Sequence, residues 1–293
     1  RNDRLFSLYL FMIYLFLVSV IWGLSFSLIK GNLSSLDSNF VSFVRLLISF
    51  FVFLPFLRLK NVNKKIAFHL VLIGIIQYGI MYLTYIYSFQ FLQAYEVAIL
   101  TLLTPFFIVL ISEIWEKKFY FIHWITALLT ILGSFIIVFK ENFTFGFWKG
   151  VLLIQVSNIC FALGQVYYKK IIGKYSNIKP LQTFAILYFG AVLITGIFSL
   201  SSTNFVSIQI NLNQIISLLY LGIIASGIGF FLWNIGVTKV ETGILAIMNN
   251  LKIPLGVLFA FILIGEKTNL LQFSFGSIII ILAFVLNNRF ANR

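Results

Sequence analysis

A lysine stands in the middle of a long apolar run, where charged side chains are rare. Lys252 lies in the segment IMNNLKIPLG, which runs from Ile247 to Gly256 and also holds two asparagines and a proline. Asn249 and Lys252 share a helix face, whereas Asn250 points elsewhere. An ammonium group can bind an anion, and amide side chains can donate or accept hydrogen bonds. The segment is therefore a candidate binding site for a small polar molecule.

The composition explains why this lysine is unusual. Of 293 residues, 61% are hydrophobic and only 10% are charged, and the apolar share of soluble domains is lower, about 45–50%. The chain is therefore predicted to be an integral membrane protein surrounded by a lipid bilayer. Its net charge of +13 comes mainly from short connectors. Without a clustered basic face, that charge does not predict nucleic-acid binding.

Apolar runs of about 20 residues are long enough to cross a bilayer as helices. They predict an all-α integral membrane protein with ten transmembrane helices. The predicted helices cover residues 5–27, 39–57, 66–89, 95–114, 120–139, 146–168, 180–200, 212–236, 243–264 and 269–288. The Lys and Arg residues of the connectors fall mostly on one side of the membrane, which predicts that both termini are cytoplasmic.

The chain also contains an internal repeat. The segment WGLSFSLIK starts at Trp22 and matches FALGQVYYK, which starts at Phe161, and the segments around Pro105 and Pro254 match as well. These matches divide the chain into two five-helix repeats, residues 1–140 and 141–293. Since five is odd, the second repeat starts on the opposite side of the membrane. Inverted repeats are typical of secondary transporters, which bind substrate near the midplane where the repeats meet.

Pro105 and Pro254 predict a break in the fourth and ninth helices. A proline ring removes a backbone donor and clashes with the carbonyl four residues earlier, which here belongs to Thr101 or Asn250. Broken helices at matching places of two repeats are a strong sequence pointer to a transport site. A kink that serves only packing is the alternative, because prolines are common in membrane helices.

The depth of Lys252 favours a role in binding. It lies about nine residues, or about 14 Å, into the ninth helix, close to the bilayer centre. A charge there costs about 2.5–3.5 kcal/mol, so we expect Lys252 to face a cavity or a partner and not lipid. No carboxylate is predicted at its depth, which leaves an anionic group of the substrate as the expected counter-charge. Bonds to backbone carbonyls are the alternative, and Lys252 is also a candidate carrier of a coupling proton.

Other helices carry side chains that could line the same cavity. The sixth has a polar face with Asn158 and Gln165, and the third has an aromatic stripe that includes Tyr78 and Tyr82. Such stripes are also typical of plain helix packing, and tryptophans often anchor a membrane interface. Arg45 in the second helix is a candidate ion-pair partner of Glu96, and solvation of both charges is the alternative. The candidate substrate-binding residues are Lys252, Asn249, Asn250, Asn158, Gln165, Tyr78, Tyr82, Trp22 and Trp233.

Several segments together resemble the ten-helix EamA family of the drug/metabolite transporter superfamily. In chain order they are WGLSFSLIK, FVRLLISF, YSFQFLQAYEVAILTLLTPFF, FFLWNIGVTKVETG and IPLGVLFAFILIGEK. The resemblance implies a carrier in the bacterial inner membrane that moves amino acids or related small metabolites, often outward, by alternating access. The chain departs from the family at NNLKIP, where Lys252 and Ile253 precede the proline.

Other functions remain as alternatives. A lipid-linked sugar flippase, or another metabolite or drug carrier, could share this fold. An enzyme is not predicted, because no acidic residue is expected at mid-membrane to serve as a catalytic group. His69 and His123 are isolated in the sequence, so neither a metal site nor a cofactor is predicted. The chain is expected to act as a monomer or a homodimer.

Overall fold

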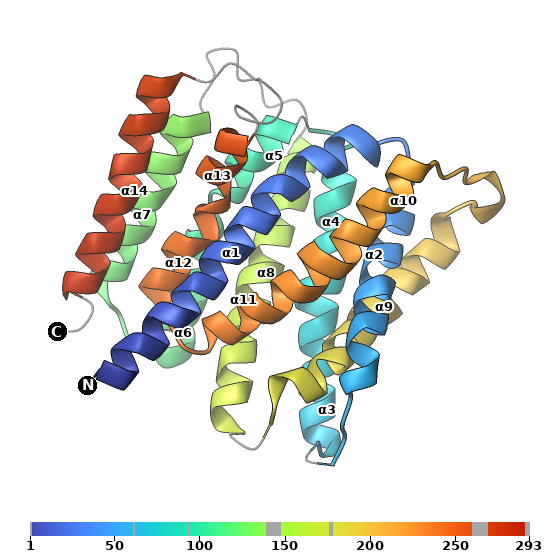
Figure 1. The fold of residues 1–293 in the computed structure, drawn as a ribbon, viewed down its shortest axis with the longest axis horizontal. Helices are drawn as coiled ribbons and strands as arrows, with labels where there is room; N and C mark the ends of the chain where they lie inside the picture. Colours follow the sequence, from blue (N-terminus) through green and yellow to red (C-terminus); the bar gives the residue numbers. More distant parts are fainter. Residues whose placement is uncertain are drawn as a thin grey trace.

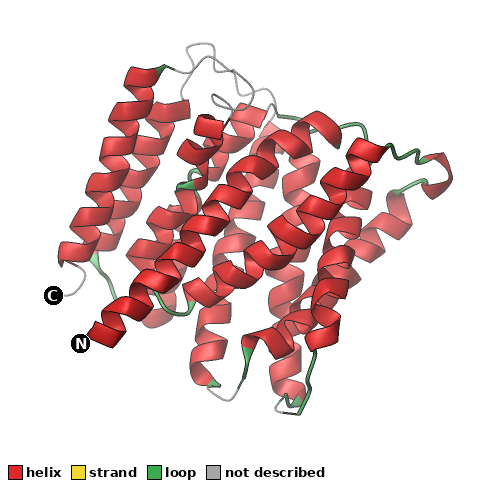
Figure 2. Cartoon of the chain, viewed as in Figure 1, coloured by secondary structure: helices red, strands yellow, loops and turns green. Residues whose placement is uncertain are grey.

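The structure, a computed structural model, describes residues 2–60, 62–92, 94–138, 148–175, 178–259 and 269–290. In this part of the chain every regular element is helical (Figures 1 and 2). Seven helices are long and apolar enough to cross a membrane, and shorter apolar helices occupy Phe11–Ser25, Phe121–Ile137 and Thr242–Leu258. Together these helices form the predicted all-α membrane protein with ten helices.

The first five spans lie between residues 2 and 138. They are α1 (Asn2–Asn32), α2 (Ser38–Phe53) with η1 (Leu54–Phe56), α3 (Lys64–Gly74) with η2 (Ile75–Ile80) and α4 (Met81–Ser88), α5 (Ala94–Thr101) with α6 (Thr104–Glu116), and α7 (Phe121–Val138). Local capping fixes where α2 and α3 begin, because the side chains of Asp37 and Asn63 accept hydrogen bonds from the first backbone N–H groups of these helices. The third span is continuous, and its η2 segment is a π-helix.

The second five spans repeat this plan. They are α8 (Trp148–Lys174), α9 (Pro180–Ser202), α10 (Leu212–Leu219) with η4 (Tyr220–Ile228) and α11 (Gly229–Val237), α12 (Thr242–Asn250) with α13 (Lys252–Phe259), and α14 (Leu270–Phe290); the short η3 (Phe205–Ser207) follows α9. Like η2, η4 is a π-helix in the third span of its repeat. The fourth span is broken in both repeats, between α5 and α6 and between α12 and α13.

The observed helix ends differ most from the predicted ones at α8, which continues to Lys174 instead of ending at residue 168, and at α1, which continues to Asn32 instead of ending at residue 27. The two π-helical segments were not expected from the sequence. The predicted helix ends at residues 139, 146 and 264, and the boundary between residues 140 and 141, lie outside the described residues.

The packing of the helices repeats as well. α1 packs on α11 and α13, and its counterpart α8 packs on α4 and α6. In the same way α2 packs on η4, while its counterpart α9 packs on η2. α7 and α14 are counterparts that pack on each other. α1 begins and α14 ends at the same end of the bundle, which we call the terminal end, and we call the opposite end the far end (Figure 1).

Glycines let helices cross closely at two places in the bundle. A Cβ added to Gly133 on α7 would lie only 2.7 Å from the carbonyl oxygen of Gly276 on α14. On α1, a Cβ added to Gly23 would lie 3.1 Å from the backbone nitrogen of Gly256 and 3.3 Å from the carbonyl oxygen of Lys252. Small residues allow such approaches between membrane helices. The second crossing holds the start of α13 against α1.

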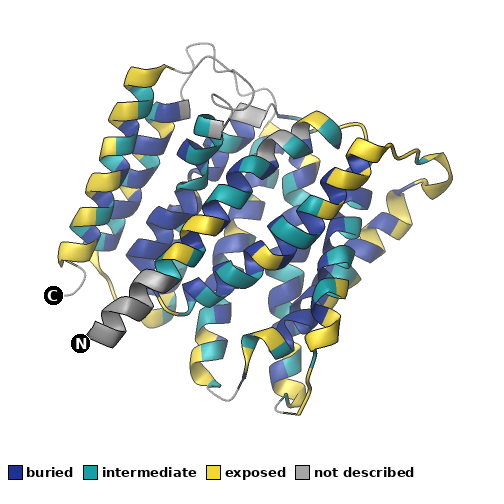
Figure 3. Ribbon diagram, viewed as in Figure 1, coloured by how far each residue is buried: buried dark blue, intermediate teal, exposed yellow. Residues whose placement is uncertain are grey.

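Burial follows the pattern of a helical membrane bundle (Figure 3). Buried residues face neighbouring helices, and many exposed residues on the outer faces are large and apolar, among them Phe51, Ile114 and Leu271. Apolar surface of this extent fits contact with lipid tails, which make no hydrogen bonds with the protein.

Candidate functional site

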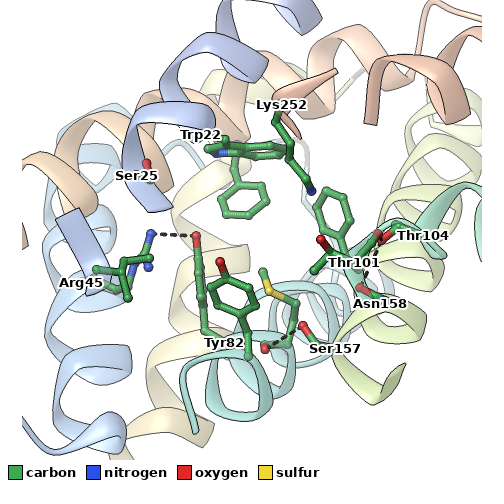
Figure 4. A pocket seen from close by; sticks show the side chains of 14 residues that line it. Trp22, Ser25, Arg45, Tyr82, Thr101, Thr104, Ser157, Asn158 and Lys252 are labelled. Atoms are coloured by element: carbon green, nitrogen blue, oxygen red, sulfur yellow. Dashed lines mark hydrogen bonds between the residues drawn. The ribbon is translucent and has the colours of Figure 1, made fainter. Parts of the chain in front are cut away.

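A cavity lies inside the bundle (Figure 4). The lining side chains come from α1, α2, α4, α5 and α6 of the first repeat and from α8, α11 and α13 of the second. They are Trp22, Ser25, Ile29, Arg45, Met81, Tyr82, Tyr85, Thr101, Thr104, Ser157, Asn158, Phe161, Phe230 and Lys252. The cavity therefore lies where the two repeats meet.

Lys252 is the first residue of α13, directly after the break in the ninth span. Its Nζ atom lies 5.5 Å from the ring centre of Trp22 and 5.7 Å from that of Phe161. Cation–π contacts of this kind stabilise an ammonium by about 0.5–2 kcal/mol. Among the described residues, Lys252 has no hydrogen-bond or ion-pair partner. Because the side chain points into the cavity (Figure 4), its N–H groups are available to a ligand.

The two helix breaks lie next to each other. In the first repeat, α5 ends at Thr101, and Pro105 follows at the start of α6. In the second, α12 ends at Asn250, and Pro254 lies in the first turn of α13. Asn250 Nδ2 donates to the Leu102 carbonyl oxygen at 3.1 Å, which joins the two breaks.

Side chains satisfy the backbone carbonyls that the first break frees. Thr104 Oγ1 donates to the Thr101 carbonyl oxygen at 2.7 Å and also lies 3.1 Å from Asn158 Oδ1. Asn158 Nδ2 in turn donates to the Leu100 carbonyl oxygen at 2.9 Å. A buried carbonyl without a donor would destabilise the fold by about 1–3 kcal/mol. This network therefore keeps the first break in place.

Arg45 is a second cation on the cavity wall and is only 2% exposed. Its Nε donates to Ser226 Oγ at 3.0 Å, and its Nη2 donates to Tyr82 Oη at 2.9 Å. The guanidinium carbon also lies 4.0 Å from the ring centre of Tyr82. The sequence predicted a pair with Glu96, but the structure gives Arg45 two hydroxyl partners instead.

An aromatic cluster closes the cavity on the side of the terminal end. The Trp22 ring packs on Phe161, Phe230 and Trp233, with ring centres 5.7, 4.9 and 4.9 Å away. Trp233 Nε1 donates to Gln165 Oε1 at 2.9 Å, and both side chains are fully buried. These contacts connect α1 with α8 and α11 on the terminal side of the cavity.

A second buried contact lies beside this cluster and joins the third span to the eighth. Gln77 Nε2 donates to Asn234 Oδ1 at 2.9 Å, and Asn234 Nδ2 donates to Tyr78 Oη at 2.8 Å. Tyr78 also stacks on Tyr188, with ring centres 5.3 Å apart. All four side chains are buried. These contacts lie between the cavity and the terminal end.

The predicted substrate-binding residues fall into two groups. Those that line the cavity are Trp22, Tyr82, Asn158 and Lys252. Those that are buried elsewhere in the bundle are Tyr78, Gln165, Trp233, Asn249 and Asn250. Gln165 packs on Trp233, as described above, and neither amide atom of Asn249 has a hydrogen-bond partner in the described structure. Contact with substrate stays a prediction for both groups.

The candidate substrate-binding residues from the sequence did not include several residues that line the cavity. They are Ser25, Ile29, Arg45, Met81, Tyr85, Thr101, Thr104, Ser157, Phe161 and Phe230. The internal repeat contained a signal for one of them, because Phe161 corresponds to Trp22 and the two rings pack together. Hydroxyl and aliphatic residues such as Ser25 and Ile29 are too common in membrane helices to be singled out by type.

Known proteins resemble this chain along most of its length. The model of the EamA-like transporter family matches twice, at residues 10–139 and 148–289. A biotin transporter of Salmonella typhimurium is 36% identical over 254 residues, which cover 84% of this chain and 83% of the relative. A biotin transporter of Escherichia coli K12 is 35% identical, covering 92% and 90%. A probable biotin transporter of Pseudomonas aeruginosa is 34% identical, covering 94% and 97%.

A solved structure has the same fold. A crystal structure aligns with this chain at a TM-score of 0.77 and covers 98% of this chain and 99% of the other. The two sequences are 15% identical, so the likeness concerns the fold alone.

Proposed function

Because the chain belongs to the EamA-like transporter family, we propose that it is a secondary transporter whose substrate is biotin. Membership of this family makes the protein a transporter and not an enzyme. The relatives named as biotin transporters are 34–36% identical over most of both chains. They favour the alternative of the sequence analysis, a carrier of another metabolite, over the expected amino-acid exporter.

The charge of the cavity is the observation that carries this proposal. Its described lining contains two cations, Arg45 and Lys252, and no acidic side chain. Biotin has one carboxylate on an aliphatic chain and a neutral bicyclic ring, so it brings one negative charge and no positive one. An amino acid would also bring an ammonium group, which would lie beside the cations without an acidic partner. Charged groups placed in a low-dielectric site without a partner are strongly disfavoured.

Each part of biotin has a matching part of the lining. Lys252 has free N–H donors and would bind the carboxylate, since hydrogen bonds between two charged groups are about twice as strong as neutral ones. Trp22, Phe161 and Phe230 offer apolar ring faces beside the ammonium, and these suit the aliphatic chain and the sulfur-containing ring. The two interactions together select an anion that carries a large apolar body.

The direction in which the cavity faces follows from the connector charges. With both termini in the cytoplasm, the far end of the bundle is external. Ser25, Ile29 and Tyr85 lie in the parts of α1 and α4 nearest the far end, so the cavity lies toward the outside. Release into the cytoplasm would then require the Trp22 cluster, together with the contacts Gln165–Trp233 and Gln77–Asn234, to separate in an alternating-access cycle.

Counterflow tests the proposal without requiring the coupling ion or the direction of net transport. Purified protein is placed in liposomes loaded with unlabelled biotin, and entry of labelled biotin is measured against protein-free liposomes. We expect biotin to enter and unlabelled biotin to compete. Biotin methyl ester, which has no carboxylate, and a set of amino acids should compete poorly. Entry no faster than into protein-free liposomes, or equal competition by the ester, would contradict the proposal.

A further inference from the structure

The way in which Arg45 is held differs from that of a carboxylate-binding arginine. A guanidinium usually binds a carboxylate through two parallel N–H···O bonds. Here the edge that carries Nε and Nη2 is already filled by two hydroxyl oxygens, Ser226 Oγ and Tyr82 Oη. These oxygens are also hydrogen bonded to each other at 3.1 Å. The pair of hydroxyls therefore occupies the place that the two oxygens of a carboxylate would take on this edge of the guanidinium.

One nitrogen of Arg45 remains without a partner. Nη1 is buried and has no hydrogen bond among the described residues, although Arg45 lines the cavity. A buried donor without an acceptor is unfavourable by about 1–3 kcal/mol, and more when the donor is charged. With this edge filled, the N–H groups that remain for a ligand are the two of Nη1 and the second of Nη2.

The two cations stand on different sides of the cavity. Arg45 projects from α2 and Lys252 from α13, and Figure 4 shows them separated by the cavity with the aromatic rings between them. Lys252 has only ring contacts and can take the carboxylate. Arg45 is fixed at two of its three nitrogens, and Nη1 is the nitrogen that has no partner among the described residues. A ligand that fits both sides has an anionic group at one end and a neutral acceptor at the other.

We propose that Arg45 recognises the ring end of the substrate by donating from Nη1 to a neutral carbonyl oxygen. On the proposed function, from which this inference follows, that oxygen belongs to the ureido group of biotin. The ureido oxygen is a strong hydrogen-bond acceptor, because resonance with both neighbouring nitrogens increases its negative charge. Tyr82 is then a positioning residue, since its hydroxyl and its ring hold the guanidinium in place.

Analogues that differ at one end of the molecule test this assignment. Phenylvalerate keeps a carboxylate, an alkyl chain and an apolar ring but has no ureido group. Iminobiotin keeps the ring system but replaces the carbonyl oxygen with a nitrogen that is protonated at neutral pH. Each is used as a competitor of labelled biotin in the counterflow assay, with the wild type and with Arg45→Gln and Arg45→Lys. Arg58→Gln, a change at an exposed arginine, serves as the matched control.

The wild type should prefer biotin to both analogues. Because a hydrogen bond from a charged donor is lost, Arg45→Gln should weaken biotin binding about 10- to 100-fold and leave competition by phenylvalerate unchanged. Arg45→Lys should retain part of the preference for biotin, and Arg58→Gln all of it. We expect Ser226 and Tyr82 to keep their mutual hydrogen bond in these variants, and thermal unfolding in detergent tests whether each variant is folded.

The outcomes separate this inference from the proposed function. If the wild type exchanges biotin and Arg45→Gln weakens biotin and phenylvalerate by the same factor, Arg45 does not read the ring end and the inference is wrong. The same holds if the wild type takes iminobiotin as well as biotin. If the wild type exchanges no biotin at all, the proposed function fails first and the inference with it. Tyr82→Phe gives an independent measurement, since it should lower the preference for biotin less than Arg45→Gln does.

Discussion

The breaks in the fourth and ninth spans occupy corresponding places in the two repeats, but the polar groups beside them differ in their hydrogen bonds. At the first break, Thr104 and Asn158 bond the carbonyls of Thr101 and Leu100. At the second break, Lys252 has no hydrogen bond, and both amide atoms of Asn249 are without partners in the described structure. At the first break, side chains of the protein bond the freed carbonyls. At the second break, the polar side chains of Lys252 and Asn249 have no hydrogen-bond partner in the described structure.

This difference suggests that duplication supplied the architecture and later sequence change divided the roles. A proline near the middle of a membrane helix frees a carbonyl wherever it occurs. Where side chains of the protein bond the freed carbonyls, the break is a rigid support. Where a cation beside the break has no partner in the protein, a ligand is needed to pair with it. We interpret the first break as the support and the second as the ligand-binding side.

The largest expected effect comes from removing the cation of the second break. Lys252→Met keeps the length of the side chain and removes its charge, so the substrate carboxylate loses its partner. Losing one member of a buried charge pair costs about 2–5 kcal/mol, and counterflow of biotin should therefore fall at least about 30-fold. Lys65→Met, at an exposed position, is the control, and Lys252→Arg should restore part of the activity. Near-normal biotin exchange by Lys252→Met would contradict the role assigned to the second break.

A smaller effect is expected from the hydrogen bond that joins the two breaks. Asn250→Leu leaves the Leu102 carbonyl without its donor and should lower the free energy of unfolding by about 1–3 kcal/mol. Its KM for biotin should not change, because Asn250 does not line the cavity. Thermal unfolding in detergent and counterflow measure these two effects.

Asn249→Leu is the matched control for that measurement. Because neither amide atom of Asn249 is bonded within the described structure, replacing it with an apolar side chain of similar size should be neutral or stabilising. A loss of stability as large as that of Asn250→Leu would mean that Asn249 has a bonding partner, such as a buried water.

The smallest effects should come from the prolines themselves. Pro105→Ala should leave counterflow unchanged, because Thr104 and Asn158 hold the first break in place. Pro254→Ala should slow counterflow, since α12 and α13 can then join more easily and shift Lys252. In both variants the free energy of unfolding should change by less than about 1 kcal/mol. Equal transport by the two variants would remove the functional distinction between the breaks.

The fold was largely predictable because the bilayer restricts what a chain can do. Spans must be long, apolar and helical, so the apolar runs predicted ten helices, and the matching segments predicted their inverted arrangement. The π-helical segments η2 and η4 were not predictable in this way. η2 holds Gln77, whose side chain packs where Gly164 of α8 approaches, and a local change of hydrogen bonding caused by a distant helix leaves no trace in the apolar pattern.

The site was predictable only where a residue is unusual for its surroundings. Lys252 was found because a charge in an apolar run is rare. Arg45 was noticed for the same reason but given the wrong partner, since Glu96 was the acidic residue expected nearest to it. Its real partners, Ser226 and Tyr82, are hydroxyl residues of kinds that occur throughout membrane helices. Gln165 was expected on the cavity because it shares a polar helix face with Asn158, yet it lies deeper and bonds Trp233.

The two cations of the cavity also have an electrical consequence. Arg45 and Lys252 do not have to cross the membrane to respond to its voltage. When access to the cavity switches from one side to the other, the electrical potential at these two charges changes. Each elementary charge that crosses 100 mV changes the free energy by about 2.3 kcal/mol. The empty carrier presents both charges to the field, whereas a bound carboxylate cancels one of them. Membrane voltage should therefore act more strongly on the empty carrier than on the loaded one.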